Sequence, residues 1–158
     1  MHSPFAFGFI TGVIYERWPY YAYRELDALL PWWARCLRPR KRLRLLFRLA
    51  NWREPRTMLL VDPTPEAYAY ITTAVSKAQV GTMPQGSADF IYLARPCDEA
   101  LHCLDSKTLL VVDNLRRNLE WWERLKKDER TAITFDLYDI GVAMFDHQYN
   151  RIDYIVSF

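Results

Sequence analysis

From Thr57 onward, short apolar runs alternate with helical patterns, and this alternation constrains the fold more than any other feature of the chain. Short runs without intervening polar residues are typical of strands that are buried on both faces. Strands separated by helices need right-handed crossovers, which produce a parallel sheet. We predict buried strands over Met58 to Val61, Ala88 to Ala94 and Thr108 to Val112.

The segments between these strands carry helix signals. Thr64 is placed to cap a helix whose first residue is Pro65, a position where proline is well tolerated. We predict helices over 65–77, 98–104 and 118–128, and one more short strand over 79–83. The end of the chain predicts three strands joined by short polar turns, over 131–137, 140–145 and 152–158, which form an antiparallel edge.

The first third of the chain is predicted to be helical. Ser3 and Pro4 form the cap and first turn of one helix, and Pro31 kinks or ends a second helix that starts near Ala22. A third helix covers about 40–52, with apolar residues on one face and arginines on the other. We predict a single domain over 1–158, with a helical cap region over 1–53 and an α/β region over 57–158.

Basic residues are concentrated in one segment, although the formal net charge of the whole chain is only +2. Between Arg35 and Arg56 there are nine basic residues and one acid, Glu54. Guanidinium and aromatic groups together suit phosphates and stacked bases. The residues of an RNA-associated module would be Arg40, Arg42, Arg44, Arg48 and Trp52. The alternative is a solvated helix face whose arginines pair with the acidic remainder of the chain, and nucleic acid is then not a partner.

Several classes of protein are excluded by composition. The three cysteines have no zinc-like spacing, which predicts reduced thiols in a cytoplasmic protein. No apolar run approaches the roughly 20 residues of a membrane span, so we expect no membrane partner. We assign no metal site, because His102 and His147 have no ligand spacing around them. Catalytic residues stay unassigned, since no arrangement of nucleophile and base stands out.

The turn after the first buried strand holds the strongest functional signal. It reads Asp62-Pro63-Thr64-Pro65, where a nucleotide-binding α/β domain has a glycine-rich loop. Such loops need glycine to reach positive φ, whereas proline fixes φ and has no N–H. Asp62, and Asp113 after the third buried strand, lie at strand ends where open α/β sheets bind ligands. They are either remnants of a cofactor pocket or ordinary turn and cap residues.

Three motifs resemble those of a known family: His2-Ser3-Pro4-Phe5, the segment from Arg44 to Leu49, and the segment from Phe135 to Phe145. The chain resembles the class I S-adenosylmethionine-dependent methyltransferase-like proteins of Bacteroidetes-type bacteria. The resemblance implies a three-layer Rossmann-like methyltransferase sheet, here reduced, with an N-terminal helical cap and antiparallel C-terminal edge strands. It also implies that Asp62 and Asp113 stand where the family carries acids at its strand tips.

The chain departs from the family pattern at several of these tips. Only Asp62 remains of the loop under the cofactor, and the segment 79–84 has no acid for the ribose hydroxyls. Too few residues separate that segment from Ala88 for the usual helix and further strand. Arg95 follows the next strand, where the family tends to have an acid. The leading hypothesis is a degenerate methyltransferase-like protein without a cofactor, acting through a protein partner or as a homo-oligomer. An active methyltransferase that holds S-adenosylmethionine by an atypical loop is the alternative.

Overall fold

The computed structural model describes residues 3–158, so His2 of the opening motif lies outside the described residues. The chain divides into two compact units. The helical unit comprises residues 1–54 and 64–76, and the sheet unit comprises residues 55–63 and 77–158. In this division the helix after the first strand groups with the N-terminal helices. The assignment of a single domain stays a prediction.

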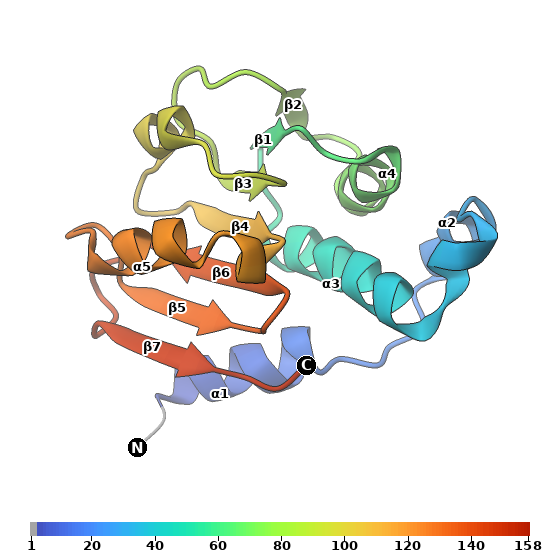
Figure 1. The fold of residues 1–158 in the computed structure, drawn as a ribbon, viewed down its shortest axis with the longest axis horizontal. Coiled ribbons are helices and arrows are strands. Elements are labelled where there is room, and N and C mark those ends of the chain that lie inside the picture. Colours follow the sequence, from blue (N-terminus) through green and yellow to red (C-terminus); the bar gives the residue numbers. More distant parts are fainter. Residues whose placement is uncertain (1–2) are drawn as a thin grey trace. The chain divides into compact units, whose positions relative to one another are not determined.

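Two helices of the helical unit have the N-caps that the sequence predicted. Ser3 Oγ accepts a hydrogen bond from the Ala6 N–H at 3.1 Å, and Thr64 Oγ1 accepts one from the Ala67 N–H at 3.1 Å. Each bond satisfies a donor that has no partner inside its helix. The elements, several of which are labelled in Figure 1, are α1 (Pro4–Phe9), the π-helix η1 (Ile10–Ile14), α2 (Tyr21–Ala28), the 3₁₀ turn η2 (Trp32–Arg35), α3 (Leu37–Arg53) and α4 (Pro65–Ala74).

Helix α3 begins at Leu37, earlier than the predicted start near Arg40. Pro39 therefore lies in the first turn of the helix. Proline is tolerated there because the first N–H groups of a helix have no intrahelical acceptor. Helix α2 ends at Ala28, before Pro31, as the prediction of a kink or end at that proline required.

The sheet unit contains one mixed sheet of seven strands. The strands are β1 (Thr57–Val61), β2 (Gln79–Gly81), β3 (Phe90–Leu93), β4 (Leu109–Asp113), β5 (Ile133–Asp136), β6 (Ile140–Met144) and β7 (Ile152–Ile155). Their spatial order is β2-β1-β3-β4-β6-β5-β7 (Figure 1). The first four strands of that order are mutually parallel, as predicted from the alternation of strands and helices.

Antiparallel pairing is present at the C-terminal end, and it comes from β6 alone. This strand pairs antiparallel with β4 on one side and with β5 on the other, whereas the outermost strand, β7, pairs parallel with β5. The predicted antiparallel pairing of the strands over 131–137 and 140–145 is confirmed, because the short turn over 137–139 joins β5 and β6 as a hairpin. The last strand differs from the prediction, since it pairs parallel with β5. The longer connection over 145–151 places β7 on the other side of β5, where it runs in the same direction as β5.

Residues 82–89 connect β2 to β3 without a helix or a strand, as the short spacing predicted. β2 lies at the edge of the sheet and pairs with β1 over three residue pairs.

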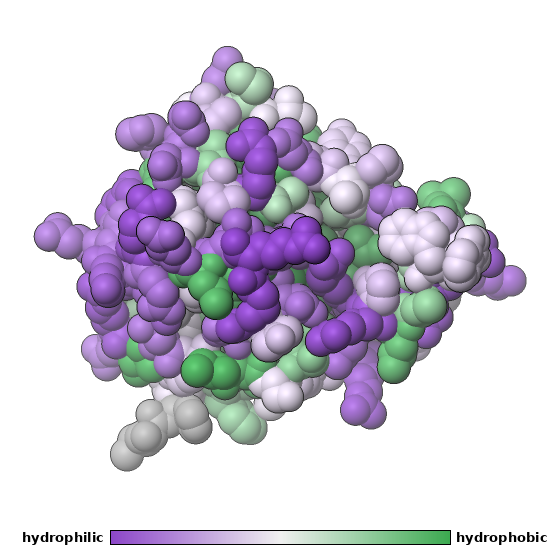
Figure 2. All heavy atoms as spheres, viewed as in Figure 1, coloured by the Kyte–Doolittle hydropathy of each residue, from purple (hydrophilic) through white to green (hydrophobic). Residues whose placement is uncertain are grey.

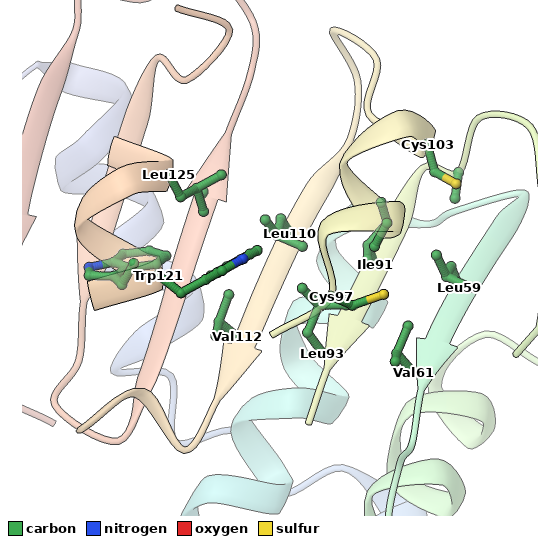
Figure 3. Packing of buried hydrophobic residues seen from close by; sticks show 14 of the residues in the cluster. Leu59, Val61, Ile91, Leu93, Cys97, Cys103, Leu110, Val112, Trp121 and Leu125 are labelled. Carbon is green, nitrogen blue, oxygen red and sulfur yellow. The ribbon is translucent and has the colours of Figure 1, made fainter. Parts of the chain in front are cut away.

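One face of the sheet is covered by the 3₁₀ helix η3 (Asp98–Cys103) and by α5 (Leu119–Lys127). Figure 3 shows Trp121 and Leu125 of α5 and Cys97 and Cys103 at η3 packed over buried side chains of β1, β3 and β4. A fully buried leucine or isoleucine of this kind contributes about 1.5–3 kcal/mol. The predicted α/β class is confirmed: a mostly parallel sheet with flanking helices. No helix within residues 3–158 is both long enough and apolar enough to span a bilayer.

Candidate functional site at the carboxyl edge of the sheet

The carboxyl ends of β1, β3 and β4 lie side by side, because the three strands are parallel neighbours. Open α/β sheets bind their ligands at this edge. Asp62 follows β1 and Asp113 ends β4, so both predicted acids are found at the expected edge. They do not contact one another, since β3 lies between their strands.

Asp62 is engaged by an arginine that follows β3. The Nε–H of Arg95 donates a hydrogen bond to Oδ2 of Asp62, and more than half of each side chain is exposed to solvent. This bond and the charge of Asp62 raise the pKa of the Arg95 guanidinium further, so it stays cationic at any physiological pH. An ion pair this exposed is screened by water and salt, so it can be displaced at little cost.

Asp113 is buried and bonded from two sides. The hydroxyl of Tyr92, on β3, donates to Oδ2 of Asp113 at 2.6 Å, and the N–H of Asn114 donates to Oδ1 at 2.8 Å. The side-chain amide of Asn114 donates to the Ala94 carbonyl at 3.2 Å, which ties the ends of β3 and β4 together. Asp113 is therefore part of the packing between these strands.

A third set of contacts extends this edge to β5. Arg116, in the 3₁₀ turn η4 (Leu115–Arg117), donates to the Asp136 carboxylate and to the Tyr138 carbonyl, the latter at 2.8 Å. Its guanidinium also lies over the Tyr138 ring, 4.6 Å from the centroid. Asp136 and Tyr138 stand at the end of β5, which runs parallel to β4.

Three residues at this edge have a left-handed backbone although none of them is glycine. Asp62 has φ +49°, Asn114 has φ +54° and Tyr138 has φ +76°. Aspartate and asparagine tolerate this region better than other non-glycine residues, whereas a tyrosine there is strained. Strain of this kind is common at functional sites and persists only where surrounding contacts enforce it.

The chemistry available at this edge is that of ion pairs and hydrogen bonds. Within residues 3–158, no three His, Cys, Asp or Glu side chains gather closely enough to hold a metal ion. A pocket of about 220 Å³ lies elsewhere in the sheet unit. It is formed by the start of β1, by β2 and by the loop that follows it, with Cys103 in its wall. Its volume is below the range of about 300–1,000 Å³ that small-molecule sites usually have.

The basic segment lies on α3, in the helical unit, and two of its arginines have structural partners. Arg48 is only 6% exposed, which contradicts the prediction that the α3 arginines share a polar face. It donates to the Val13 carbonyl at 2.8 Å and to the Ile14 carbonyl at 2.9 Å, because the end of η1 leaves these carbonyls without helical partners. Arg44 pairs with Asp27.

The remaining candidates of this segment are less enclosed. Arg40 and Arg42 are half-buried, and Trp52 is partly exposed. The Trp52 ring meets the Phe9 ring edge-on at a centroid distance of 4.9 Å, so it also packs against α1. The predicted RNA-binding set therefore does not form one open surface.

Sequence reasoning missed Tyr92, Asn114 and Arg116, and it read Arg95 only as the loss of an acid. The sequence did contain a signal for the ion pair. Arg95 is basic and follows β3, and β3 is the neighbour of β1, which ends just before Asp62. That signal can be used only once the strand order is known, since Arg95 and Asp62 are far apart in sequence.

Three of the solved structures with likeness to this chain are methyltransferases. One from Geobacter sulfurreducens has 16% identity and a TM-score of 0.48, and the match covers 77% of this chain and 95% of that one. One from Podospora anserina, bound to SAH, has 11% identity and a TM-score of 0.49, with 92% and 97% covered. The O-methyltransferase from Bacillus cereus in complex with SAH has 12% identity and a TM-score of 0.45, with 86% and 95% covered.

No protein-family model matches the sequence, and comparison with curated proteins gave no match. Likeness to solved structures at these identities does not assign an activity to the chain.

Proposed function

We propose that this chain is a methyltransferase-like protein that does not use S-adenosylmethionine and that acts by binding a protein partner. The turn after β1 carries the proposal. At the place where a cofactor loop would present backbone N–H groups, Asp62 is bonded by Arg95 and is followed by Pro63. The three free cysteines support a cytoplasmic location for such a protein.

The residues around this turn do not fit an adenosyl cofactor. Such a cofactor needs close backbone N–H donors near the first strand and an acid for its ribose hydroxyls. Pro63 and Pro65 have no N–H to donate, and β2 ends at Gly81, followed by Thr82 and Met83, neither of which is acidic. Asp113 is buried, and its carboxylate already accepts hydrogen bonds from the Tyr92 hydroxyl and the Asn114 N–H.

One observation favours the alternative of an active methyltransferase with an atypical loop. Asp62 already has the left-handed backbone that glycine supplies in cofactor loops. Its partner, Arg95, is exposed, so a ligand could displace it from the carboxylate.

Calorimetric titration with S-adenosylmethionine and S-adenosylhomocysteine separates the two. Each hydrogen bond that the turn cannot supply is worth about 0.5–1.5 kcal/mol, and more where a charge is involved. A loss of about 4 kcal/mol moves a micromolar affinity to millimolar. We therefore expect no binding of either compound at sub-millimolar concentration.

Two variants and a matched control make this test decisive. Micromolar binding that is lost in Asp62→Ala and retained in Glu120→Gln, which alters an exposed acid on α5, would overturn the proposal in favour of the active enzyme. Arg95→Ala frees the Asp62 carboxylate without altering the prolines. On the present proposal this variant does not bind either compound, because the missing donors and the missing acid are not restored.

A further inference from the structure

The helical unit exposes large apolar side chains between the end of α2 and the start of α3. Leu29 is 75% exposed, Trp32 is 83% exposed and Leu37 is 73% exposed. Trp33, between them, is also exposed. Contiguous exposed apolar surface on a folded protein marks a site of interaction with a protein or a membrane.

The same stretch is strongly basic. Residues 32–42 contain five basic residues and no acid: Arg35, Arg38, Arg40, Lys41 and Arg42. Arg38 and Lys41 are exposed, and their spacing places them on one face of α3, with Leu37 one turn from Lys41. Leu29, Trp32, Trp33, Leu37, Arg38 and Lys41 are named the aromatic–basic patch below.

The patch is held in a fixed conformation. Leu30 and Ala34 are buried and anchor the segment, so the residues beside them point outward. Arg35 donates from Nε to the Leu30 carbonyl at 2.9 Å and from Nη2 to the Ala28 carbonyl at 3.3 Å, which closes the end of α2. The N–H of Ala34 donates to the Pro31 carbonyl at 2.9 Å. An ordered segment presents its apolar side chains without a large entropic cost on binding.

We propose that the aromatic–basic patch binds the surface of an anionic lipid bilayer. Tryptophan is favoured at the level of lipid headgroups, leucine partitions into the acyl boundary, and arginine and lysine attract acidic headgroups. This attachment is peripheral and replaces the expectation of no membrane partner, which rested only on the lack of a spanning segment. No helix in residues 3–158 could span a bilayer, and a peripheral contact needs none. It does not rest on the function proposed above, because the patch is far in sequence from the carboxyl edge of the sheet.

Charge and side-chain type favour lipid over the other occupants. A second copy of the chain would bring two basic patches together, which like charges oppose. Figure 2 shows pale and green side chains beside purple ones over α2, a mixture of aromatic, apolar and charged residues. α2 itself adds one exposed acid, Glu25, and one exposed base, Arg24, so it leaves the positive charge unchanged. RNA would use the arginines and tryptophans, but Leu29 and Leu37 cannot stack on bases.

The test is sedimentation of the full chain with vesicles of phosphatidylcholine alone and with mixed phosphatidylcholine–phosphatidylglycerol vesicles. We expect binding to the mixed vesicles only, weakening as salt is raised. Each basic residue near an anionic surface contributes about fivefold to the partition constant. Arg38→Gln with Lys41→Gln should therefore lower it about 25-fold, and Leu37→Ser about tenfold.

Matched controls lie in the sheet unit. Arg124→Gln with Lys127→Gln removes the same charge from exposed positions on α5, and Ile155→Ser removes an exposed apolar side chain from β7. Both should leave the partition constant within about twofold.

Absence of binding to the mixed vesicles would overturn the proposal, and so would equal losses in the controls. Tight binding of single-stranded RNA at physiological salt that Leu37→Ser leaves unchanged would assign the patch to nucleic acid instead. A dimer that Leu37→Ser dissociates, seen by light scattering and without vesicle binding, would assign it to self-association.

Discussion

Replacing Gly141 by alanine tests the packing of the sheet unit at its tightest point. Gly141 lies in β6, opposite Val112 of β4 and Asp136 of β5. A Cβ at this position would lie 2.7 Å from Cη2, 2.8 Å from Cζ3 and 3.0 Å from Cζ2 of Trp122. Carbon atoms attract one another best at about 3.5–4.0 Å, so the added methyl group overlaps the indole ring.

The indole ring has no room to move away. Trp122 is a fully buried residue of α5 and belongs to the cluster that packs on the sheet. Overpacking a filled core costs about 1–3 kcal/mol. Alanine recovers about 0.4–1 kcal/mol, because it restricts the unfolded chain more than glycine does. We expect Gly141→Ala to lower the free energy of unfolding by about 1–2 kcal/mol, which corresponds to a fall in Tm of about 2–8 °C.

Thermal and urea unfolding followed by far-ultraviolet circular dichroism measure this change. Gly81→Ala is the matched control, because Gly81 is also in a strand and a Cβ there would be 3.9 Å from its nearest neighbours. The Nε1–H of Trp122 has no hydrogen-bond partner among the described residues, so Trp122→Phe breaks no bond. Gly141→Ala should be better tolerated in the Trp122→Phe background. An unchanged Tm for Gly141→Ala alone, or strictly additive effects of the two changes, would refute the overlap.

Two further predictions concern the helical unit. Asp27 accepts hydrogen bonds from Arg44 and Tyr70, so Asp27→Asn should lower the free energy of unfolding by about 1–3 kcal/mol, whereas Glu25→Gln, on the exposed face of α2, should not. Burial raises the pKa of Tyr20 to about 12, and burial with the Asp27 bond raises that of Tyr70. Above pH 10 the unfolded tyrosines lose protons that the folded ones keep, so the contribution of these tyrosines to stability should be constant below pH 10 and fall above it. The share of Tyr70 is at most about 1.4 kcal/mol per pH unit, and urea midpoints of Tyr70→Phe should lack it.

Local structure could be predicted from the sequence because its signals are local. The caps at Ser3 and Thr64, the buried strands and the missing helix between β2 and β3 follow from residue type and spacing. The order of strands is not encoded in periodicity, and so the position of β6 inside the sheet was not predicted. Arg48 was misplaced for a related reason. Its burial depends on the carbonyls of Val13 and Ile14, far away in sequence.

The position of the candidate site could be predicted from the sequence, but the partners of its two acids could not. Asp62 and Asp113 both lie at the carboxyl edge of the sheet, since the ends of parallel strands share one edge. Their partners come from the strand between them, Tyr92 within β3 and Arg95 after it. A partner on a neighbouring strand becomes apparent only when the neighbours are known.

The two arginines at this edge contact two of its three left-handed residues. Arg95 bonds the side chain of left-handed Asp62, while Arg116 bonds the carbonyl of left-handed Tyr138 and stacks on its ring. A strained backbone persists only where surrounding contacts enforce it, and the contacts of Arg95 and Arg116 are of this kind. If the arginines serve this purpose alone, Arg95→Ala should loosen the turn and gain no ligand. The backbone of Asp62 in that variant therefore tests whether the ion pair with Arg95 enforces the left-handed conformation.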